Sequence, residues 1–444
     1  MKFGGTSVAD ADAINRVIAI VAKEKAPVVV VSALSKVTDT LVKVCRLAED
    51  GDGAGAAAAL NGLVDRHVAL ATALTAFSET LIAGIRAEFA EVIGLVHALA
   101  VLREVSPRSQ DAVLSTGELV SSRIVAAALA DRGIASEWVD ARGVLVTDAE
   151  YTAAVPDMAA TCDRVREKLA PLQAAGKVAV LSGFIGATAS GVTTTLGRGG
   201  SDYSAAIFGA CLGVSEIQIW TDVDGMLTAD PRVVQDPRLV EQLSFHEASE
   251  LAFFGAKVLH PSTILPAIDK NIPVLILNSR RPENMGTRIT AEGRPGATGL
   301  TALACKRDVT VVDITSTRML MAHGFLRRLF EVFERFRTPV DVVTTSEVSV
   351  SVTVDDTRRL GDIVEALQHF AEVSSERDMA IICAVGENLG SDPTVFARAV
   401  NALNGVPLRL VSQAASRRNI TFVLRDADVP EAMTRLHDEF FRGD

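Results

Sequence analysis

The first 280 residues combine two spacings of apolar positions. Ile14, Val17, Ile18 and Val21 follow the i, i+3, i+4, i+7 spacing of one helix face. Short apolar runs rich in β-branched residues are typical of strands buried on both faces, and they occur at 28–33, 178–184, 216–220 and 273–277. Helices that alternate with such strands predict an α/β domain with a mostly parallel sheet between two helical layers, a three-layer αβα arrangement.

Two stretches interrupt this alternation. Residues 37–110 are rich in alanine and leucine and carry few strand signals, so we expect a mainly helical insertion there. Turn-forming residues then cluster between 281 and 300, around Pro282, Gly286 and Pro295. The sequence therefore predicts a first domain over residues 1–285 and a linker over 286–300.

Beyond the linker, one pattern of elements occurs twice. A strand, a helix, two strands and a helix are expected over 309–370, and the same order returns over 379–441. This repeat predicts two ferredoxin-like βαββαβ units within 301–444, at about 309–375 and 376–444, with the strand at 301–314 available to both.

Composition narrows the classes of partner and compartment. The net charge of -11 argues against a nucleic-acid partner, which would require a basic face. No apolar run approaches the ~18–20 residues of a membrane span, and no basic segment with an apolar core opens the chain. The five cysteines form no C-x-x-C pair, so we expect free thiols in a reducing cytoplasm.

Two glycine-rich segments carry the strongest chemical signal. Residues 2–7 and 195–202 each combine glycines and hydroxyls with one cation, Lys2 in the first and Arg198 in the second. Glycine allows backbone N–H groups to close around an oxyanion, and a helix that begins beyond the loop adds its positive end. The simpler alternative is a tight turn or a polar surface loop. Two such segments far apart in sequence instead favour one binding site for a phosphorylated ligand.

Other candidates have plausible structural explanations. Asp222 and Gly225 follow an expected strand and fit either an ordinary D-G turn or a nucleotide contact at a strand end. Arg232 and Lys257 are either exposed cations or phosphate ligands. Glu118 is either a carboxylate favoured at a helix N-terminus or a partner for a substrate ammonium. The His-Glu pair at 246–247 resembles the start of a zinc motif but lacks the second histidine, so we do not expect a zinc site there. No other segment of the sequence has the spacing of metal ligands.

Taken in order along the chain, these motifs resemble those of aspartate kinase in the amino-acid kinase family, of the lysine-sensitive monofunctional type with tandem C-terminal ACT domains. The resemblance covers nearly the whole chain. It is carried by segments 2–8, 31–38, 115–119, 183–186, 195–203, 220–225, 229–232, 254–261 and 344–350. It implies ATP-dependent phosphorylation of the β-carboxylate of L-aspartate, with 4-phospho-L-aspartate entering lysine, threonine and methionine synthesis.

The resemblance also implies roles for individual residues. The expected catalytic residues are Lys2, Arg198 and Asp202. Aspartate would bind through Ser32, Ala33, Thr38, Glu118, Arg198 and Ser201. ATP would bind through Lys2, Gly4, Gly5, Thr6, Ser7, Thr221, Asp222, Gly225, Leu227, Arg232, Lys257 and Val258. Mg²⁺ is expected on the phosphates, with no dedicated protein ligand. Leu227 replaces a tyrosine that is usual in the family.

Regulation and assembly follow from the same resemblance. An amino-acid effector, lysine by the closest match, would bind at the ACT domains through Met319, Gly324, Phe325, Leu326, Val340, Asp341, Ser346 and Glu347. Two positions depart from the lysine-sensitive pattern, Met321 and Pro339. Asp341 and Glu347 fit either an effector ammonium or solvated strand ends. ACT domains in this family pair between chains, so a homodimer or homotetramer is expected.

Two other functions remain open at this point. One is a related amino-acid kinase that acts on another carboxylate, such as glutamate. The other is a non-catalytic amino-acid sensor with an inactive kinase domain, which the intact Lys2, Arg198 and Asp202 disfavour.

Overall fold

The computed structural model describes the chain except residues 77, 256–260, 294–298, 320–322, 414–415 and 443–444. Contacts divide it into two compact units. Unit 1 comprises Met1–Met226, Glu241–Phe245 and Val258–Glu292, and unit 2 comprises Leu227–Val240, His246–Lys257 and Gly293–Asp444. Each unit is described by itself.

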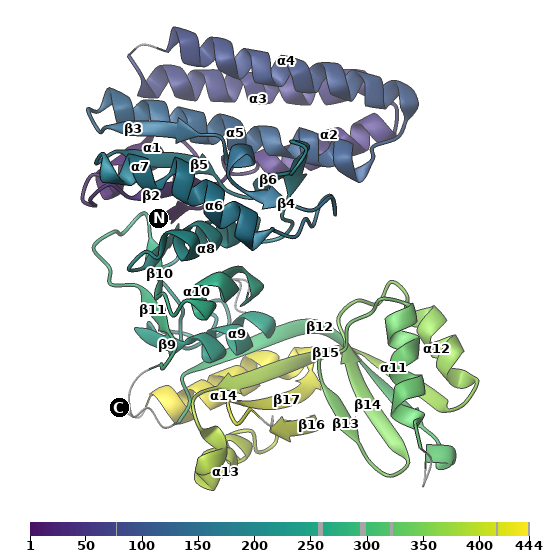
Figure 1. Ribbon diagram of the computed structural model, residues 1–444. Helices are drawn as coiled ribbons and strands as arrows, with labels where there is room; N and C mark the ends of the chain where they lie inside the picture. Colours follow the sequence, from purple (N-terminus) through teal and green to yellow (C-terminus); the bar gives the residue numbers. More distant parts are fainter. Residues whose placement is uncertain (77, 256–260, 294–298, 320–322, 414–415, 443–444) are drawn as a thin grey trace. The chain divides into compact units, whose positions relative to one another are not determined.

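An eight-stranded sheet forms the centre of unit 1 (Figure 1). Its order is β3-β5-β2-β1-β8-β10-β11-β9, and the pairs from β3 to β10 are parallel, as predicted. The strands are β1 Lys2–Phe3, β2 Val28–Val31, β3 Ser136–Val139, β5 Val178–Ser182, β8 Ile217–Thr221, β9 Gln242–Ser244, β10 Val274–Asn278 and β11 Thr287–Thr290. A small second sheet contains β4 Val146–Thr147, β6 Ile185–Thr188 and β7 Thr193–Thr195.

Both faces of the large sheet are covered, which confirms the three-layer αβα class. Along β2, Val29 and Val31 join one apolar core, and Val28 and Val30 join another on the opposite face. The first core contains α1 Ala11–Val21 and α5 Pro107–Asp131, and the second contains α6 Met158–Lys168 and α8 Gly200–Leu212. Two short helices complete unit 1, α7 Ala170–Ala174 and α10 Leu265–Asp269.

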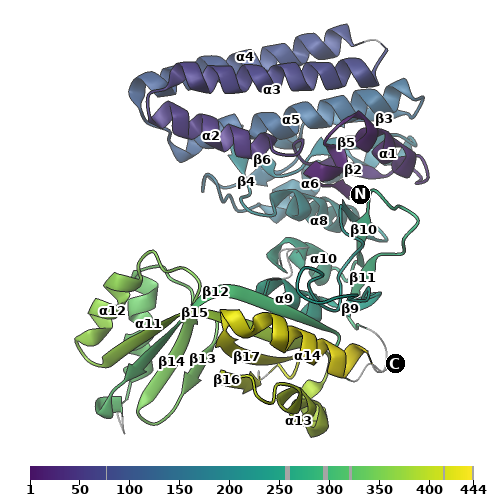
Figure 2. The same ribbon diagram turned by 180° about the vertical axis from the view of Figure 1, so that it is seen from behind.

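The expected helical insertion is present as three helices that lead into α5 (Figures 1 and 2). They are α2 Val37–Glu49, α3 Gly53–Leu74 and α4 Glu79–Leu102. The Ser106 side chain caps α5, and Pro107 occupies its first turn, where a missing N–H costs nothing. By length and composition α5 could cross a membrane, but 83% of its most apolar window is buried within the described structure, as is typical of a core helix.

Unit 2 is built on a six-stranded antiparallel sheet of order β13-β14-β12-β15-β17-β16. Two apolar cores lie along it, one with α11 and α12 and one with α13 and α14. The long central strands β12 and β15 contribute to both cores, so the two ferredoxin-like halves share strands. The elements are β12 Ala302–Thr315, α11 Phe325–Arg335, β13 Val343–Thr345, β14 Ser349–Val354, α12 Leu360–Gln368, β15 Glu372–Val385, α13 Pro393–Ala402, β16 Leu408–Gln413, β17 Asn419–Arg425 and α14 Val429–Phe441.

Three findings differ from the sequence expectations. Strand β11 lies inside the stretch expected as a linker, paired with β10. Residues 227–240 belong to unit 2, where the Thr228 hydroxyl lies 2.9 Å from His437 Nε2. Most of α9, Phe245–Phe253, belongs to unit 2 as well.

The expectation of five free thiols was wrong for two of them. Cys162 on α6 and Cys211 on α8 form a disulfide, with their Cα atoms 4.8 Å apart. The two cysteines lie 49 residues apart, and their proximity depends on the packing of α6 against α8, which sequence spacing does not reveal. Cys45, Cys305 and Cys383 are free.

Candidate active site

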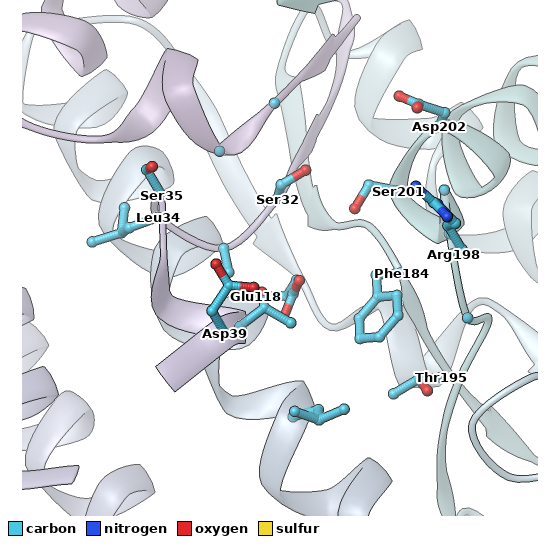
Figure 3. A pocket seen from close by; sticks show the side chains of 18 of the residues that line it. Ser32, Leu34, Ser35, Asp39, Glu118, Phe184, Thr195, Arg198, Ser201 and Asp202 are labelled. Carbon is cyan, nitrogen blue, oxygen red and sulfur yellow. The ribbon is translucent and has the colours of Figure 1, made fainter. Parts of the chain in front are cut away.

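A cavity of about 640 Å³ opens in unit 1, where the carboxyl ends of β1, β2, β5 and β8 lead into loops. This edge of a parallel sheet is the usual ligand site in open α/β folds. Two sets of side chains face each other across it (Figure 3). One set contains Ser32, Ser35, Asp39 and Glu118, and the other contains Phe184, Thr195, Arg198, Ser201 and Asp202.

Most of the predicted site residues line this cavity. All of the expected catalytic and aspartate-binding residues do so: Lys2, Ser32, Ala33, Thr38, Glu118, Arg198, Ser201 and Asp202. Of the expected nucleotide ligands, Lys2, Gly4, Gly5, Thr6 and Thr221 line it. The structure therefore brings together the two glycine-rich segments, which are almost 200 residues apart in sequence.

The first glycine-rich segment turns sharply after β1. The Gly4 N–H donates to the Trp220 carbonyl at 3.0 Å, and a Cβ added to Gly5 would lie 3.0 Å from the Ala33 carbonyl oxygen. The backbone can therefore approach the loop after β2 only because residue 5 has no side chain. Ser7 lies outside the lining, because its hydroxyl is buried against the Ser279 hydroxyl at 2.8 Å.

The second glycine-rich segment leads into the N-terminus of α8. Gly197 and Gly199 both have φ of 73°, a left-handed conformation that glycine adopts without strain. The first turn of α8 then presents its positive dipole end beside the cavity, which favours an anionic ligand. Arg198 is exposed here and forms no ion pair with a carboxylate that the structure describes.

Lys2 and Asp202 join the two segments. The Lys2 ammonium lies 2.6 Å from Asp202 Oδ1, and both side chains are mostly buried. Asp202 is in the first turn of α8, where a carboxylate is favoured. The ion pair therefore fixes the Lys2 ammonium beside the first turn of α8.

Glu118 is a buried acid of the cavity with a strongly raised pKa. It lies on α5 with 3% of its surface exposed, and its Oε2 has no hydrogen-bond partner among the described residues. Burial raises its pKa from 4.5 to about 8, although a hydrogen bond from the Ala33 backbone opposes the shift. A buried, unpartnered carboxylate oxygen at a cavity is a strong candidate for binding a cationic group.

The lining also contains residues that sequence reasoning did not single out. Three of them, Lys36, Thr152 and Phe184, are non-glycine residues with left-handed φ of 67°, 71° and 68°. Such conformations cost energy and concentrate at functional sites. Lys36 and Phe184 lie in the segments 31–38 and 183–186 that carry the family resemblance, but nothing in the sequence indicates their backbone conformation. Thr152 lies in no such segment. Leu34, Ser35, Asp39, Gln110 and Leu114, to which no role was assigned from the sequence, also line the cavity.

The other expected nucleotide ligands lie outside this lining. Asp222 and Gly225 belong to unit 1, and Asp222 accepts a 3.3 Å hydrogen bond from the Thr221 hydroxyl. Leu227 and Arg232 belong to unit 2, where Arg232 forms an ion pair with Asp230 at 2.5 Å. Lys257 and Val258 lie outside the described residues.

The expected effector residues all lie in unit 2, around α11 and the β13–β14 turn. Gly324 precedes α11 with φ of 81°, Phe325 is buried in the core, and Leu326 is exposed. Met319 and Val340 pack partly buried against the same core. Ser346 hydrogen bonds to Ser349 at 2.7 Å, and Glu347 is exposed.

Asp341 differs from a solvated strand end. Lys306 Nζ lies 2.8 Å from Asp341 Oδ1 and 2.7 Å from Asp355, while Asp341 Oδ2 is buried without a partner in the described structure. Burial raises the pKa of Asp341. Met321 lies outside the described residues.

Comparisons with known proteins agree with this fold. A family model described as the amino acid kinase family matches residues 1–278, and an ACT domain model matches residues 382–440. Aspartokinase 3, chloroplastic, of Arabidopsis thaliana is 37% identical over 466 residues, covering 100% of this chain and 82% of the relative. Lysine-sensitive aspartokinase 3 of Escherichia coli (strain K12) is 35% identical over 454 residues, covering 99% of this chain and 98% of the relative.

Solved structures give the same result. The crystal structure of E. coli aspartokinase III in complex with aspartate and ADP has a TM-score of 0.86 at 34% identity and covers 99% of both chains. The structure of that protein in complex with lysine and aspartate has a TM-score of 0.83. The chain belongs to the amino acid kinase family. Within that family its similarity over almost its full length places it among the aspartokinases that carry a C-terminal ACT domain.

Proposed function

We propose that this aspartokinase transfers the γ-phosphoryl group of ATP to the β-carboxylate of L-aspartate. The product is 4-phospho-L-aspartate, the first intermediate toward lysine, threonine and methionine. The observation that carries the proposal is the cavity of unit 1, in which Arg198 and the start of α8 face the buried carboxylate of Glu118 (Figure 3). Lys2, paired with Asp202, lines the same cavity. Such a site suits a zwitterion that carries additional negative charge.

The chemistry requires positioning more than proton transfer. A side-chain carboxylate with an ordinary pKa of ~3.9 is already ionised at neutral pH, so it attacks phosphorus without a general base. Two anions repel each other as they approach, and neutralising the charge on the transferring phosphoryl group is the main catalytic task. The Lys2 ammonium supplies the positive charge that neutralises the phosphoryl group, and Asp202 holds this ammonium in place.

The substrate contacts follow from charge and position. Arg198 binds the α-carboxylate of aspartate through paired hydrogen bonds, and Glu118 binds the α-ammonium. Smaller polar contacts complete the pocket, from Ser32, Ala33, Thr38 and Ser201. The proposed selectivity for aspartate rests on Lys2 lining the same cavity as Arg198 and Glu118, so that it can meet the β-carboxylate of a substrate held between them.

The nucleotide contacts remain a proposal based on the family resemblance. They comprise Gly4, Gly5, Thr6, Ser7, Thr221, Asp222, Gly225, Leu227, Arg232, Lys257 and Val258. No group of three His, Cys, Asp or Glu side chains in the described part of the chain forms a metal site, and Asp202 is engaged by Lys2. The proposal is that Mg²⁺ enters on the phosphates of ATP, as this ion usually does in kinases.

Organisation and regulation complete the proposal. Unit 1 forms the kinase domain, and its strand β11 extends into the stretch 286–300 that was expected as a linker. The tandem ACT domains lie within 301–444 of unit 2, bind an amino-acid effector, and pair into a homodimer or homotetramer in the cytoplasm. The E. coli relative is named lysine-sensitive and has been crystallised with lysine, which supports lysine as the effector.

The activity is tested by trapping acyl phosphate with hydroxylamine in the presence of ATP and a panel of amino acids. We expect aspartate-dependent product and little product with glutamate. Product formed with glutamate alone would favour the related amino-acid kinase. No product with any substrate, together with tight binding of an effector, would favour the non-catalytic sensor.

Lysine is expected to inhibit the reaction, and Asp341→Ala is expected to raise the half-inhibitory lysine concentration at least about tenfold. The reason is that a buried carboxylate pairs strongly with an ammonium, at ~1.5–3 kcal/mol for a charged hydrogen bond. Inhibition is measured in the hydroxamate assay. Asp355→Ala is the control, because Asp355 also contacts Lys306 but 38% of its side chain is exposed. Inhibition by threonine or methionine and not by lysine would contradict the assignment.

A further inference from the structure

A fully buried carboxylate, Asp111, lies next to the cavity without lining it. It is near the start of α5, one turn after the Ser106 cap. Its carboxylate accepts hydrogen bonds from the Thr152 backbone N–H (2.9 Å), the Thr195 backbone N–H (2.9 Å) and the Thr195 hydroxyl (2.6 Å). All three donors belong to residues that line the cavity. Thr152 lies in the loop after β4, and Thr195 is the last residue of β7, from which the loop that bears Arg198 continues.

These two loops also contact each other. The Ala154 N–H donates to the Thr195 carbonyl at 2.9 Å, and a Cβ added to Gly197 would lie 3.0 Å from the Thr152 carbonyl oxygen. Thr152 is held in a left-handed conformation, which a β-branched residue adopts only under constraint. Asp111 supplies that constraint by accepting the Thr152 N–H.

The geometry of α5 links this anchor to the substrate pocket. Asp111, Leu114 and Glu118 follow at i, i+3 and i+7, so they share one face of the helix. Leu114 and Glu118 line the cavity. One rigid helix face therefore carries Glu118 itself and the anchor of the loop that bears Arg198.

Burying an ionised carboxylate in this environment costs free energy. Burial raises the pKa of Asp111, and the three hydrogen bonds oppose that shift. An apolar residue would fill the space without this cost, but it could not hold two backbone N–H groups of separate loops. The arrangement therefore indicates a requirement for fixed loop geometry.

The geometry points to Asp111 as a positioning residue that fixes Arg198 at a set distance from Glu118 and so determines affinity for the α-amino acid part of the substrate. This inference rests on the proposed function of Arg198 and Glu118. Asp111 itself touches no substrate, because it acts through the backbone of Thr195 and Thr152.

We expect Asp111→Ala to raise KM for aspartate about tenfold, the change that corresponds to ~1.4 kcal/mol, while KM for ATP stays within about twofold. Asp111→Asn is expected to restore KM for aspartate to within about threefold of the wild type. Its amide oxygen can accept both backbone N–H groups, and its amide nitrogen can donate to the Thr195 hydroxyl. Both constants are measured on the full chain by hydroxamate formation.

Asp148→Asn is the matched control. Asp148 is exposed, lies in the same loop as Thr152, and accepts N–H groups from Glu150 (3.1 Å) and Val155 (2.9 Å). It holds the loop locally but does not connect it to α5 or to Thr195, so both KM values are expected to remain unchanged.

A purely structural role for Asp111 would lower the melting temperature without separating the two KM values, and that result would overturn the inference. If Asp111→Ala does not fold, Thr195→Val tests the same anchor by removing only the hydroxyl hydrogen bond. It is expected to raise KM for aspartate about threefold, and an unchanged KM there would equally overturn the inference. Failure of the proposed function is distinct, because the wild-type chain would then form no aspartate-dependent acyl phosphate.

Discussion

Replacement of Lys2 by alanine is expected to lower kcat by a factor on the order of a hundred to a thousand, with the fold retained. Lys2 is the cation at the junction of the two glycine-rich segments, and its ammonium is held 2.6 Å from Asp202. Removing a preorganised charge from a mostly buried site costs about this much, because water cannot replace it at the same position. The loss is expected in kcat more than in KM, since the charge on the phosphoryl group develops in the transition state.

The measurement is steady-state hydroxamate formation, with circular dichroism and thermal melting to verify the fold. Lys177→Ala is the control, since Lys177 also forms a lysine–carboxylate pair, with Glu137 at 3.1 Å, but both partners are about half exposed. Exposed pairs contribute little, so its kcat and melting temperature are expected to remain near those of the wild type. A Lys2→Ala variant with wild-type turnover would remove Lys2 from the mechanism.

The layered fold could be predicted because its signals are local. The strand expected at 178–184 is β5 Val178–Ser182, and β-branched residues within a short apolar run were sufficient to identify it. Strand β11 was missed because its four residues lie among turn-formers and are stabilised by pairing with β10 and β9. The assignment of residues 227–240 to unit 2 likewise depends on long-range contacts, such as Thr228 with His437.

The residues of the site also differ in whether a local sequence signal identifies them. Lys2 and Arg198 were predicted because glycine-rich loops leave a sequence signature, and the structure places both at one cavity. Thr152 lies in no such motif, and segment 183–186, which contains Phe184, gave no sign that this residue is left-handed. Neighbouring segments impose both conformations, so they could not be predicted. Asp111 was missed for a related reason: a single carboxylate in a helix indicates nothing until its donors, 41 and 84 residues away, are known.

Glu118→Gln is expected to raise KM for aspartate roughly a hundredfold at pH 8.5, because a buried charged partner of the substrate ammonium is lost. The same variant is expected to be more stable than the wild type at that pH. The folded-state pKa of about 8 lies above the ordinary 4.5, so between these two pH values the folded wild type holds a proton that the unfolded chain has released. Stability of the wild type therefore falls as pH rises from about 4.5 to 8, and glutamine removes that loss.

The pH dependence of substrate binding separates this role from simple packing. Below pH 8 the wild-type carboxyl is mostly protonated in the absence of substrate, and aspartate binds productively only after that proton leaves. KM for aspartate is therefore expected to fall by up to about tenfold per pH unit between pH 6 and 8 and then level off, and to be nearly flat in Glu118→Gln. Glu137→Gln, an exposed control, should keep the wild-type profile. Identical slopes in the wild type and Glu118→Gln would show that the titrating group is a different one.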